Sequence, residues 1–148
     1  MIVNKKIRFG VTDLLLLAGG AAFLIGTRTF MAFCGPKEDG SFMNCHWAGE
    51  MLFALALLFT VLAILHLLLP DPGIKTGLDI GMAGLSVLTI FVPGKIIRLC
   101  AMDTMICRAS AQPRTVFAGI ILTLLCLTDL VTQAAACSRD KHSRKAGM

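Results

Sequence analysis

Charged side chains are scarce in this chain of 148 residues. Asp, Glu, Lys and Arg make up 16% of it and hydrophobic residues 56%, whereas soluble domains carry about 25% charged residues. A soluble domain this short cannot bury so much apolar surface, because its surface is large relative to its volume. The scarcity of charge therefore predicts a protein that is solvated by a lipid bilayer.

Several motifs of catalysis and binding are also missing. The sequence has no phosphate-binding glycine loop, no nucleophile elbow and no pair of acid–base carboxylates in a recognisable context. The net charge is +5, but the basic residues lie at the chain ends and between apolar runs, without the interleaved aromatics that bind single strands. We therefore expect no nucleic-acid partner and no cofactor, and we favour a protein that is not an enzyme.

Four apolar stretches dominate the sequence. Only the second is uninterrupted over the roughly 20 residues that cross a hydrocarbon core. Each of the others continues past one ionisable residue whose side chain can reach the headgroups. We predict an all-α membrane protein, a single domain (1–148) with four transmembrane helices in two αα-hairpins, spanning residues 13–33, 48–69, 78–97 and 116–136.

Basic residues near both chain ends predict the orientation. Lys5, Lys6 and Arg8 precede the first span, and Arg139, Lys141, Arg144 and Lys145 follow the fourth. Since basic segments tend to stay in the cytoplasm, we expect both ends there, including the tail 137–148. The loops 34–47 and 98–115 then lie outside the cytoplasmic membrane.

The placement of the cysteines agrees with this orientation. Four of the six lie in the two outer loops, and disulfides persist in oxidising compartments. Local pairing would join Cys34 to Cys45 and Cys100 to Cys107, although four cysteines allow three connectivities. We interpret Cys126, in the middle of a span, as a small buried apolar residue.

The loop motifs resemble a known bacterial family. They read Cys34-Gly35, Met43-x-Cys45-His46-Trp47, Cys100-x-Met102 and Met105-x-Cys107-Arg108, followed by Pro113. This pattern is similar to the membrane proteins grouped as domain-of-unknown-function family 4418. The resemblance implies a four-span protein of the bacterial cytoplasmic membrane with no established activity. It also implies companionship with ABC-type export permeases.

The outer cysteines, methionines and histidine allow two further interpretations. Soft thiolate and thioether ligands with an imidazole suit copper(I), and less well haem or zinc. Alternatively, a cysteine pair in each outer loop resembles the layout of quinone-linked disulfide oxidases, although their C-x-x-C motif is missing. We favour structural disulfides over both. The candidate metal or redox residues are Cys34, Met43, Cys45, His46, Cys100, Met102, Met105 and Cys107.

Ionisable residues within the spans are a separate set of candidates, because charge inside a membrane is costly. Near the predicted cytoplasmic ends lie Asp13, His66, Asp79 and Asp129, which would form one polar cluster if they face inward. Near the outer ends lie Arg28, Glu50 and Lys95. We expect pairing that fixes helix register rather than transport by this chain alone.

Small residues recur at four-residue spacing in the first and third spans, at Ala18, Ala22 and Gly26 and at Gly77 and Gly81. This spacing lets helices approach closely in lipid, and we expect it to serve packing within the bundle. The function we predict is an accessory or interaction subunit in contact with lipid and a membrane-protein partner, with an ABC-type exporter as one candidate.

Overall fold

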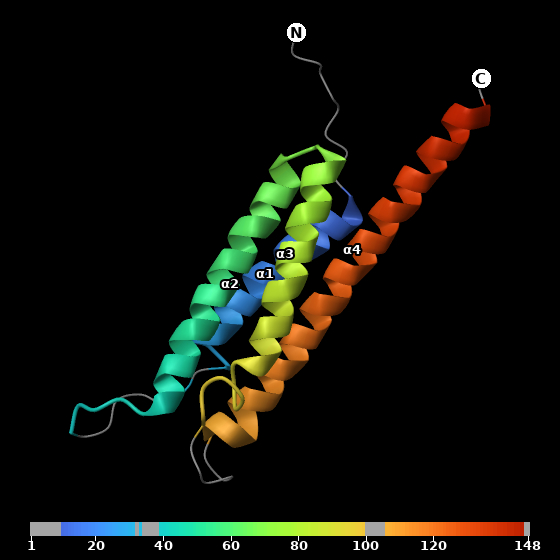
Figure 1. Cartoon of the computed structure of the whole chain (residues 1–148). Helices are drawn as coiled ribbons and strands as arrows, with labels where there is room; N and C mark the ends of the chain where they lie inside the picture. The colour runs from blue at the N-terminus through green and yellow to red at the C-terminus, as the bar shows by residue number, and fades with distance from the viewer. Residues whose placement is uncertain (1–9, 32, 34–38, 100–105, 147–148) are drawn as a thin grey trace.

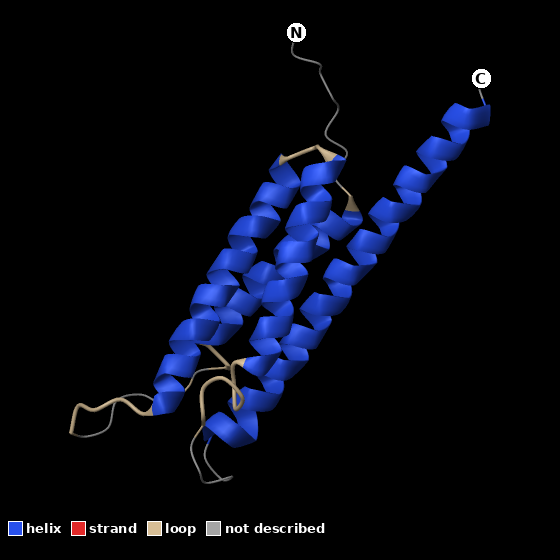
Figure 2. Ribbon diagram, viewed as in Figure 1, coloured by secondary structure: helices blue, strands red, loops and turns tan. Residues whose placement is uncertain are grey.

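The chain forms a bundle of long helices. The computed structural model describes residues 10–31, 33, 39–99 and 106–146, with side chains described as far as residue 135. Every regular element in these ranges is a helix (Figure 2), which confirms the predicted all-α fold. The elements are α1 (Val11–Arg28), α2 (Asn44–Leu68), α3 (Pro72–Phe91), the π-helix η1 (Cys107–Ala111) and α4 (Gln112–Ala146).

The helices run side by side and alternate in direction (Figure 1). The start of α1, the turn between α2 and α3, and the far end of α4 lie at one end of the bundle, which we call the turn end. The connections that follow α1 and α3 lie at the other end, the loop end. The last part of α4 continues past the rest of the bundle (Figure 1).

Four segments are long and apolar enough to cross a membrane: Val11–Arg28, Asn44–Leu68, Pro72–Phe91 and Cys107–Ala135. Only 22% to 33% of each apolar segment is buried inside the bundle. The remaining surface carries large apolar side chains, such as the exposed Leu58 and Val61 of α2 and Leu124 of α4. Because water would not solvate such a surface, lipid must, and the chain is a multi-pass membrane protein.

The helix ends follow local sequence signals. Pro72 occupies the first turn of α3, where its missing N–H is not needed, and the Asp71 side chain accepts a hydrogen bond from Gly73 N at 2.9 Å. At the other end of α3 the chain reverses at Gly94, whose φ is 92°. α3 thus begins six residues before the start of the predicted span 78–97 and ends six residues before the end of that span. A helix boundary is not a lipid boundary, so the four predicted spans stay predictions.

Apolar side chains from all four long helices fill the centre of the bundle. They include Leu16 and Phe23 of α1, Leu52 and Phe59 of α2, Met82 of α3, and Leu122 and Cys126 of α4. Cys126 is fully buried, as expected of a small apolar residue. Two glycines permit close packing here: a Cβ at Gly20 would lie 2.9 Å from the Phe59 ring, and one at Gly119 2.7 Å from Ile90.

The small residues of α3 do not pack inside the bundle, contrary to our expectation. Gly77, Gly81 and Gly84 are exposed, and a Cβ added at any of them would meet no other atom of the described chain within 4 Å. On a helix, residues spaced by four and three share one side. That side points away from the other helices because α3 buries Asp79, Met82 and Ser86 on its opposite side.

Replacing a closely packed glycine and an exposed glycine by leucine should affect the stability of the bundle differently. Gly119→Leu should lower the free energy of unfolding by about 1–3 kcal/mol, since the new side chain meets Ile90 and the Ser86 carbonyl oxygen. Gly84→Leu, the matched control, gains the same helix propensity in open space and should not be destabilised. Unfolding in mixed detergent micelles measures both. Equal destabilisation would contradict this packing of α3 on α4.

Candidate functional site

A group of polar side chains lies inside the bundle toward the turn end. Asp13 comes from α1, His66 from α2, Lys75 and Asp79 from α3, and Asp129 and Gln133 from α4. We call these six residues the buried polar cluster. Asp13, His66, Asp79 and Asp129 are each at most 5% exposed. Every long helix therefore contributes at least one ionisable group to it.

Asp13 lies at the margin of the cluster, in the first turn of α1. Its Oδ2 accepts a hydrogen bond from the backbone N–H of Gly10 at 3.3 Å, which caps the helix and favours a negative charge at its N-terminus. The same oxygen receives the ammonium of Lys75 at 2.8 Å. The Lys75 side chain is 17% exposed, so it lies between the cluster and the surroundings.

His66 lies at the centre of the cluster. Its Nε2 is 3.1 Å from Asp79 Oδ1 and 3.3 Å from Asp129 Oδ2, while its Nδ1 is 3.5 Å from Asp13 Oδ1. The imidazole thus stands among three carboxylates from three other helices. Distance alone does not make these contacts hydrogen bonds: within the described chain, Nδ1 and Asp79 Oδ1 have no partner in hydrogen-bond geometry.

Gln133 supplies the donors that hold two of the carboxylates. Its Nε2 lies 2.6 Å from Asp79 Oδ2 and 2.8 Å from Asp129 Oδ2. The same nitrogen lies 3.3 Å from His66 Nε2, so two carboxylates and the imidazole share the two protons of the amide. Its Oε1 accepts a hydrogen bond from the Thr76 hydroxyl at 3.2 Å. The amide therefore links α3 to α4 and keeps the carboxylates of Asp79 and Asp129 close to each other.

Such an arrangement can do several things chemically. A buried charge is costly unless it is paired, and removing one partner of a buried pair is costly as well. The cluster therefore ties four helices together at a fixed register. Carboxylates and an imidazole are also proton acceptors and metal ligands, and atoms of Asp13, His66 and Asp129 that could bind one ion all lie within 4.8 Å of one another.

The structure brings together the four turn-end residues that the sequence singled out. Sequence reasoning missed Lys75 and Gln133. Gln133 follows Asp129 by four residues, so the two share a helix side, and this spacing could have revealed it. Lys75 lies in the first turn of α3, before the predicted span 78–97, and nothing in the sequence marks its contact with Asp13.

At the loop end, Arg28 and Glu50 form a bidentate ion pair with distances of 2.8 and 3.1 Å. The guanidinium also lies 4.0 Å from the centre of the Phe53 ring, which favours its charge. Both side chains are well exposed, at 53% and 40%. Lys95, the third predicted residue, is exposed in the segment after α3 and does not join this pair.

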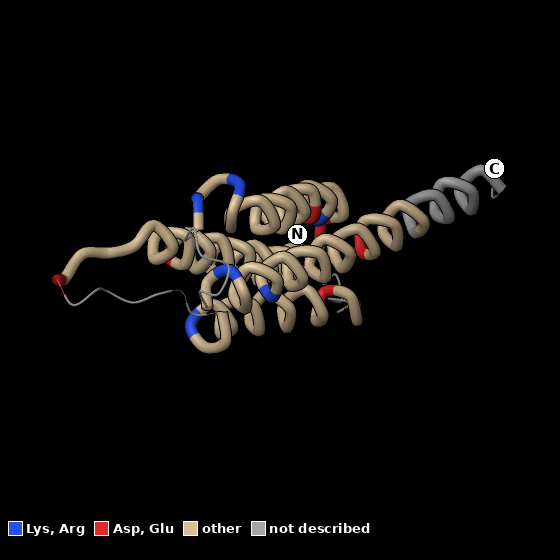
Figure 3. Tube along the Cα trace, turned by 90° about the horizontal axis from the view of Figure 1, so that it is seen from below, with Lys and Arg blue, Asp and Glu red and all other residues tan. Residues whose placement is uncertain are grey.

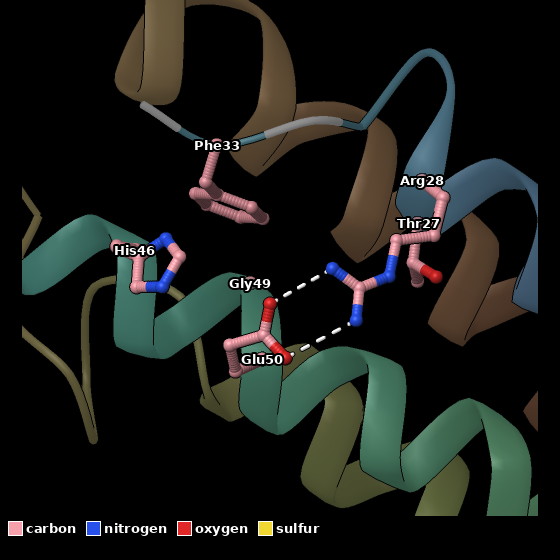
Figure 4. A pocket seen from close by; sticks show the side chains of 6 residues that line it. All are labelled: Thr27, Arg28, Phe33, His46, Gly49 and Glu50. Atoms are coloured by element: carbon pink, nitrogen blue, oxygen red, sulfur yellow. Dashed lines mark hydrogen bonds and ion pairs between the residues drawn. The ribbon is translucent and has the colours of Figure 1, made fainter. Parts of the chain in front are cut away.

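A cavity of about 190 Å³ adjoins this ion pair (Figure 4). Phe33 covers one side and His46, from the first turn of α2, another, while the paired side chains of Arg28 and Glu50 together line a third (Figure 4). The imidazole of His46 stacks on Phe42 with 4.3 Å between ring centres and meets Trp47 edge-on. Aromatic packing thus positions the imidazole of His46.

Half of the eight predicted outer-loop residues lie outside the described ranges. This holds for Cys34, Cys100, Met102 and Met105. Cys45 and Cys107 are both fully buried at the loop end, and Met43 directly precedes α2. The two disulfide pairings, the redox interpretation and the outer metal site therefore stay predictions.

Charge is distributed unequally between the two ends of the bundle (Figure 3). The described part of the loop end exposes Lys95, Arg98, Arg108 and Arg114. Its acidic residues include Asp39, whose pKa is held below its usual value by hydrogen bonds from the hydroxyl and the amide of Ser41. The carboxylates of Asp13, Asp79 and Asp129 all lie toward the turn end instead.

Loss of the Gln133 amide tests the pairing inside the cluster. Gln133→Ala should lower the free energy of unfolding by about 1–3 kcal/mol, because two buried carboxylates lose a donor. Gln112→Ala is the matched control, since that side chain makes one long bond of 3.4 Å to the Pro93 carbonyl oxygen. Unfolding in mixed micelles compares them. If both variants were equally stable, the amide would not hold the carboxylates.

Comparison with known proteins gives one match. A family model described as a domain of unknown function (DUF4418) matches residues 15–132. This range includes the cores of all four long helices and both connections at the loop end. No curated protein and no solved structure matches the chain.

Proposed function

The chain belongs to the DUF4418 family, and from that premise we propose that it is a non-catalytic accessory subunit of a larger membrane complex. The family description assigns no activity, so the proposal depends on the surface of the bundle. The connections between the helices are too short to form a catalytic domain of their own. What the bundle offers a partner is its membrane-facing helix surface.

The observation that carries this proposal is the open glycine side of α3, formed by Gly77, Gly81 and Gly84. No other atom of the described chain lies within 4 Å of a Cβ placed at any of them. Lipid tails are as apolar as leucine, so helices in a membrane associate through close packing rather than through the hydrophobic effect. A glycine strip lets a second helix approach the backbone of α3 closely, where larger side chains would hold it away.

The partner to test first is an ABC-type export permease, the companion implied by the family resemblance. Purification of the full chain in mild detergent should co-isolate this permease. Gly81→Leu should reduce the recovery of the partner at least tenfold because the new side chain occupies the contact. The chain itself should stay as stable as the wild type, since the added atoms meet no residue of it.

Ala22→Leu is the matched control, because Ala22 is exposed on α1, away from the glycine side. It should leave recovery of the partner unchanged. Isolation of the wild-type chain alone under several gentle conditions would contradict the accessory role. If the wild type and Gly81→Leu recover equal amounts of the partner, the complex exists but the glycine side of α3 is not its contact.

We further propose that the chain lies in the cytoplasmic membrane, with the turn end inside and loops 34–47 and 98–115 outside. The support is the basic residues at both ends of the sequence together with the four loop cysteines. The exposed basic residues described at the loop end reduce the contrast, so a direct measurement is needed. We also propose the pairs Cys34–Cys45 and Cys100–Cys107 as closures of these loops.

Thiol labelling of intact cells tests the orientation. In a chain with its six cysteines replaced by serine, Asp39→Cys should react with a membrane-impermeant maleimide, because residue 39 is exposed at the loop end. Asp71→Cys, exposed in the turn between α2 and α3, should react only after the cells are opened. The reverse pattern would invert the proposed topology. Mass mapping of the native chain without reduction would identify the disulfide pairs.

A further inference from the structure

The buried polar cluster contains more negative than positive charge. Three carboxylates, from Asp13, Asp79 and Asp129, face one ammonium, from Lys75, around the imidazole of His66. With the imidazole neutral, the cluster has two negative charges more than positive ones, and with the imidazole protonated it has one more. In an apolar bundle such an excess is costly, and buried charges are paired or bind metals. A divalent cation would bring this cluster to neutrality.

The hydrogen bonding of His66 is incomplete. Its Nδ1 is buried, and no donor or acceptor of the described chain is in hydrogen-bond geometry with it. The same nitrogen lies 3.5 Å from Asp13 Oδ1. If Nδ1 is unprotonated, its lone pair stands beside a carboxylate oxygen, which is unfavourable unless a cation lies between the two. This unsatisfied nitrogen, 99% buried, is the second observation that points to a ligand.

The distances agree with coordination geometry. Zinc binds histidine nitrogen and carboxylate oxygen at about 2.1 Å, so two ligand atoms of a tetrahedral site are about 3.4 Å apart. The separation of 3.5 Å between His66 Nδ1 and Asp13 Oδ1 is close to this value. Asp129 is the candidate for a third ligand: its Oδ2 lies 3.3 Å from the other ring nitrogen, Nε2, and one ligand atom each from Asp13, His66 and Asp129 lies within 4.8 Å of the other two. Its carboxylate would have to move toward Asp13 when an ion binds.

The groups around these ligands have different roles. Gln133 donates to Asp129 Oδ2 at 2.8 Å, and such a partner orients a ligand of a metal site. Lys75 lies 2.8 Å from Asp13 Oδ2, where its positive charge competes with an ion for this carboxylate. Oxygen ligands with an imidazole suit the borderline ion zinc or the harder manganese(II) rather than copper(I), which prefers sulfur. The partly exposed Lys75 marks the side from which an ion would reach the site.

We propose that Asp13, His66 and Asp129 bind a divalent first-row transition-metal cation inside the bundle. The charged groups that face the imidazole are Asp13 on α1, Lys75 and Asp79 on α3, and Asp129 on α4. The proposal does not depend on the accessory role, because the site lies on the opposite side of α3 from Gly77, Gly81 and Gly84.

Equilibrium dialysis of the purified full chain against Mn²⁺ or Zn²⁺, followed by elemental analysis, tests the proposal. We expect one ion per chain. Mn²⁺ is the sharper probe, because it favours oxygen and nitrogen over the sulfur of the loop cysteines. His66→Gln and Asp129→Asn should each weaken binding at least tenfold. His46→Gln is the matched control at the loop end and should bind as the wild type does.

Lys75→Gln separates metal binding from a purely structural role. Removing the ammonium takes away a competing positive charge, so metal affinity should rise, although the ion pair with Asp13 is lost. If His66→Gln does not fold, Asp129→Asn and Lys75→Gln still decide the question. No uptake by the folded wild type, uptake unaffected by Asp129→Asn, or uptake abolished by His46→Gln would each overturn the proposal. Proton uptake without metal binding would overturn it as well.

Discussion

Taking an ionised side chain out of water into an apolar bundle costs several kcal/mol unless another group pairs with it. This constraint applies here to three carboxylates, one imidazole and one ammonium from four helices. Each group finds its partners on other helices: Asp13 on α1 with Lys75 on α3, and Asp79 on α3 with Gln133 on α4. Sliding any helix by one turn would separate these groups and leave a charge unpaired.

The rest of the bundle follows from that register. Leu, Phe and Met side chains pack in many alternative ways at similar cost, so the apolar core alone specifies the alignment of the helices less strictly. At the loop end the ion pair of Arg28 and Glu50 is exposed, with side chains 53% and 40% accessible, and exposed pairs contribute little. The turn end therefore fixes the arrangement, and at the loop end the helices pack around buried apolar residues such as Met31 and Val92.

The sequence was informative where one simple physical rule decides the outcome. Scarce charge and four apolar runs predicted an all-α membrane bundle, because helices satisfy their backbone hydrogen bonds internally in lipid. The similar depth of Asp13, His66, Asp79 and Asp129 suggested a shared cluster, and the structure brings them together. Side-chain partners were harder to predict: nothing in the sequence shows that Lys75 reaches Asp13, since they are far apart along the chain and meet only when α1 and α3 are placed.

The glycines of α3 show why a motif does not identify its partner. Spacing by four residues predicts a close helix contact, but it does not say whether the second helix belongs to the same chain. Burial of Asp79 decides this question here. With Asp79, Met82 and Ser86 turned inward, the helix period places Gly77, Gly81 and Gly84 on the outer side. One buried carboxylate thus sets which side of α3 remains open, and the need to pair that charge determines the surface that the bundle presents to its membrane.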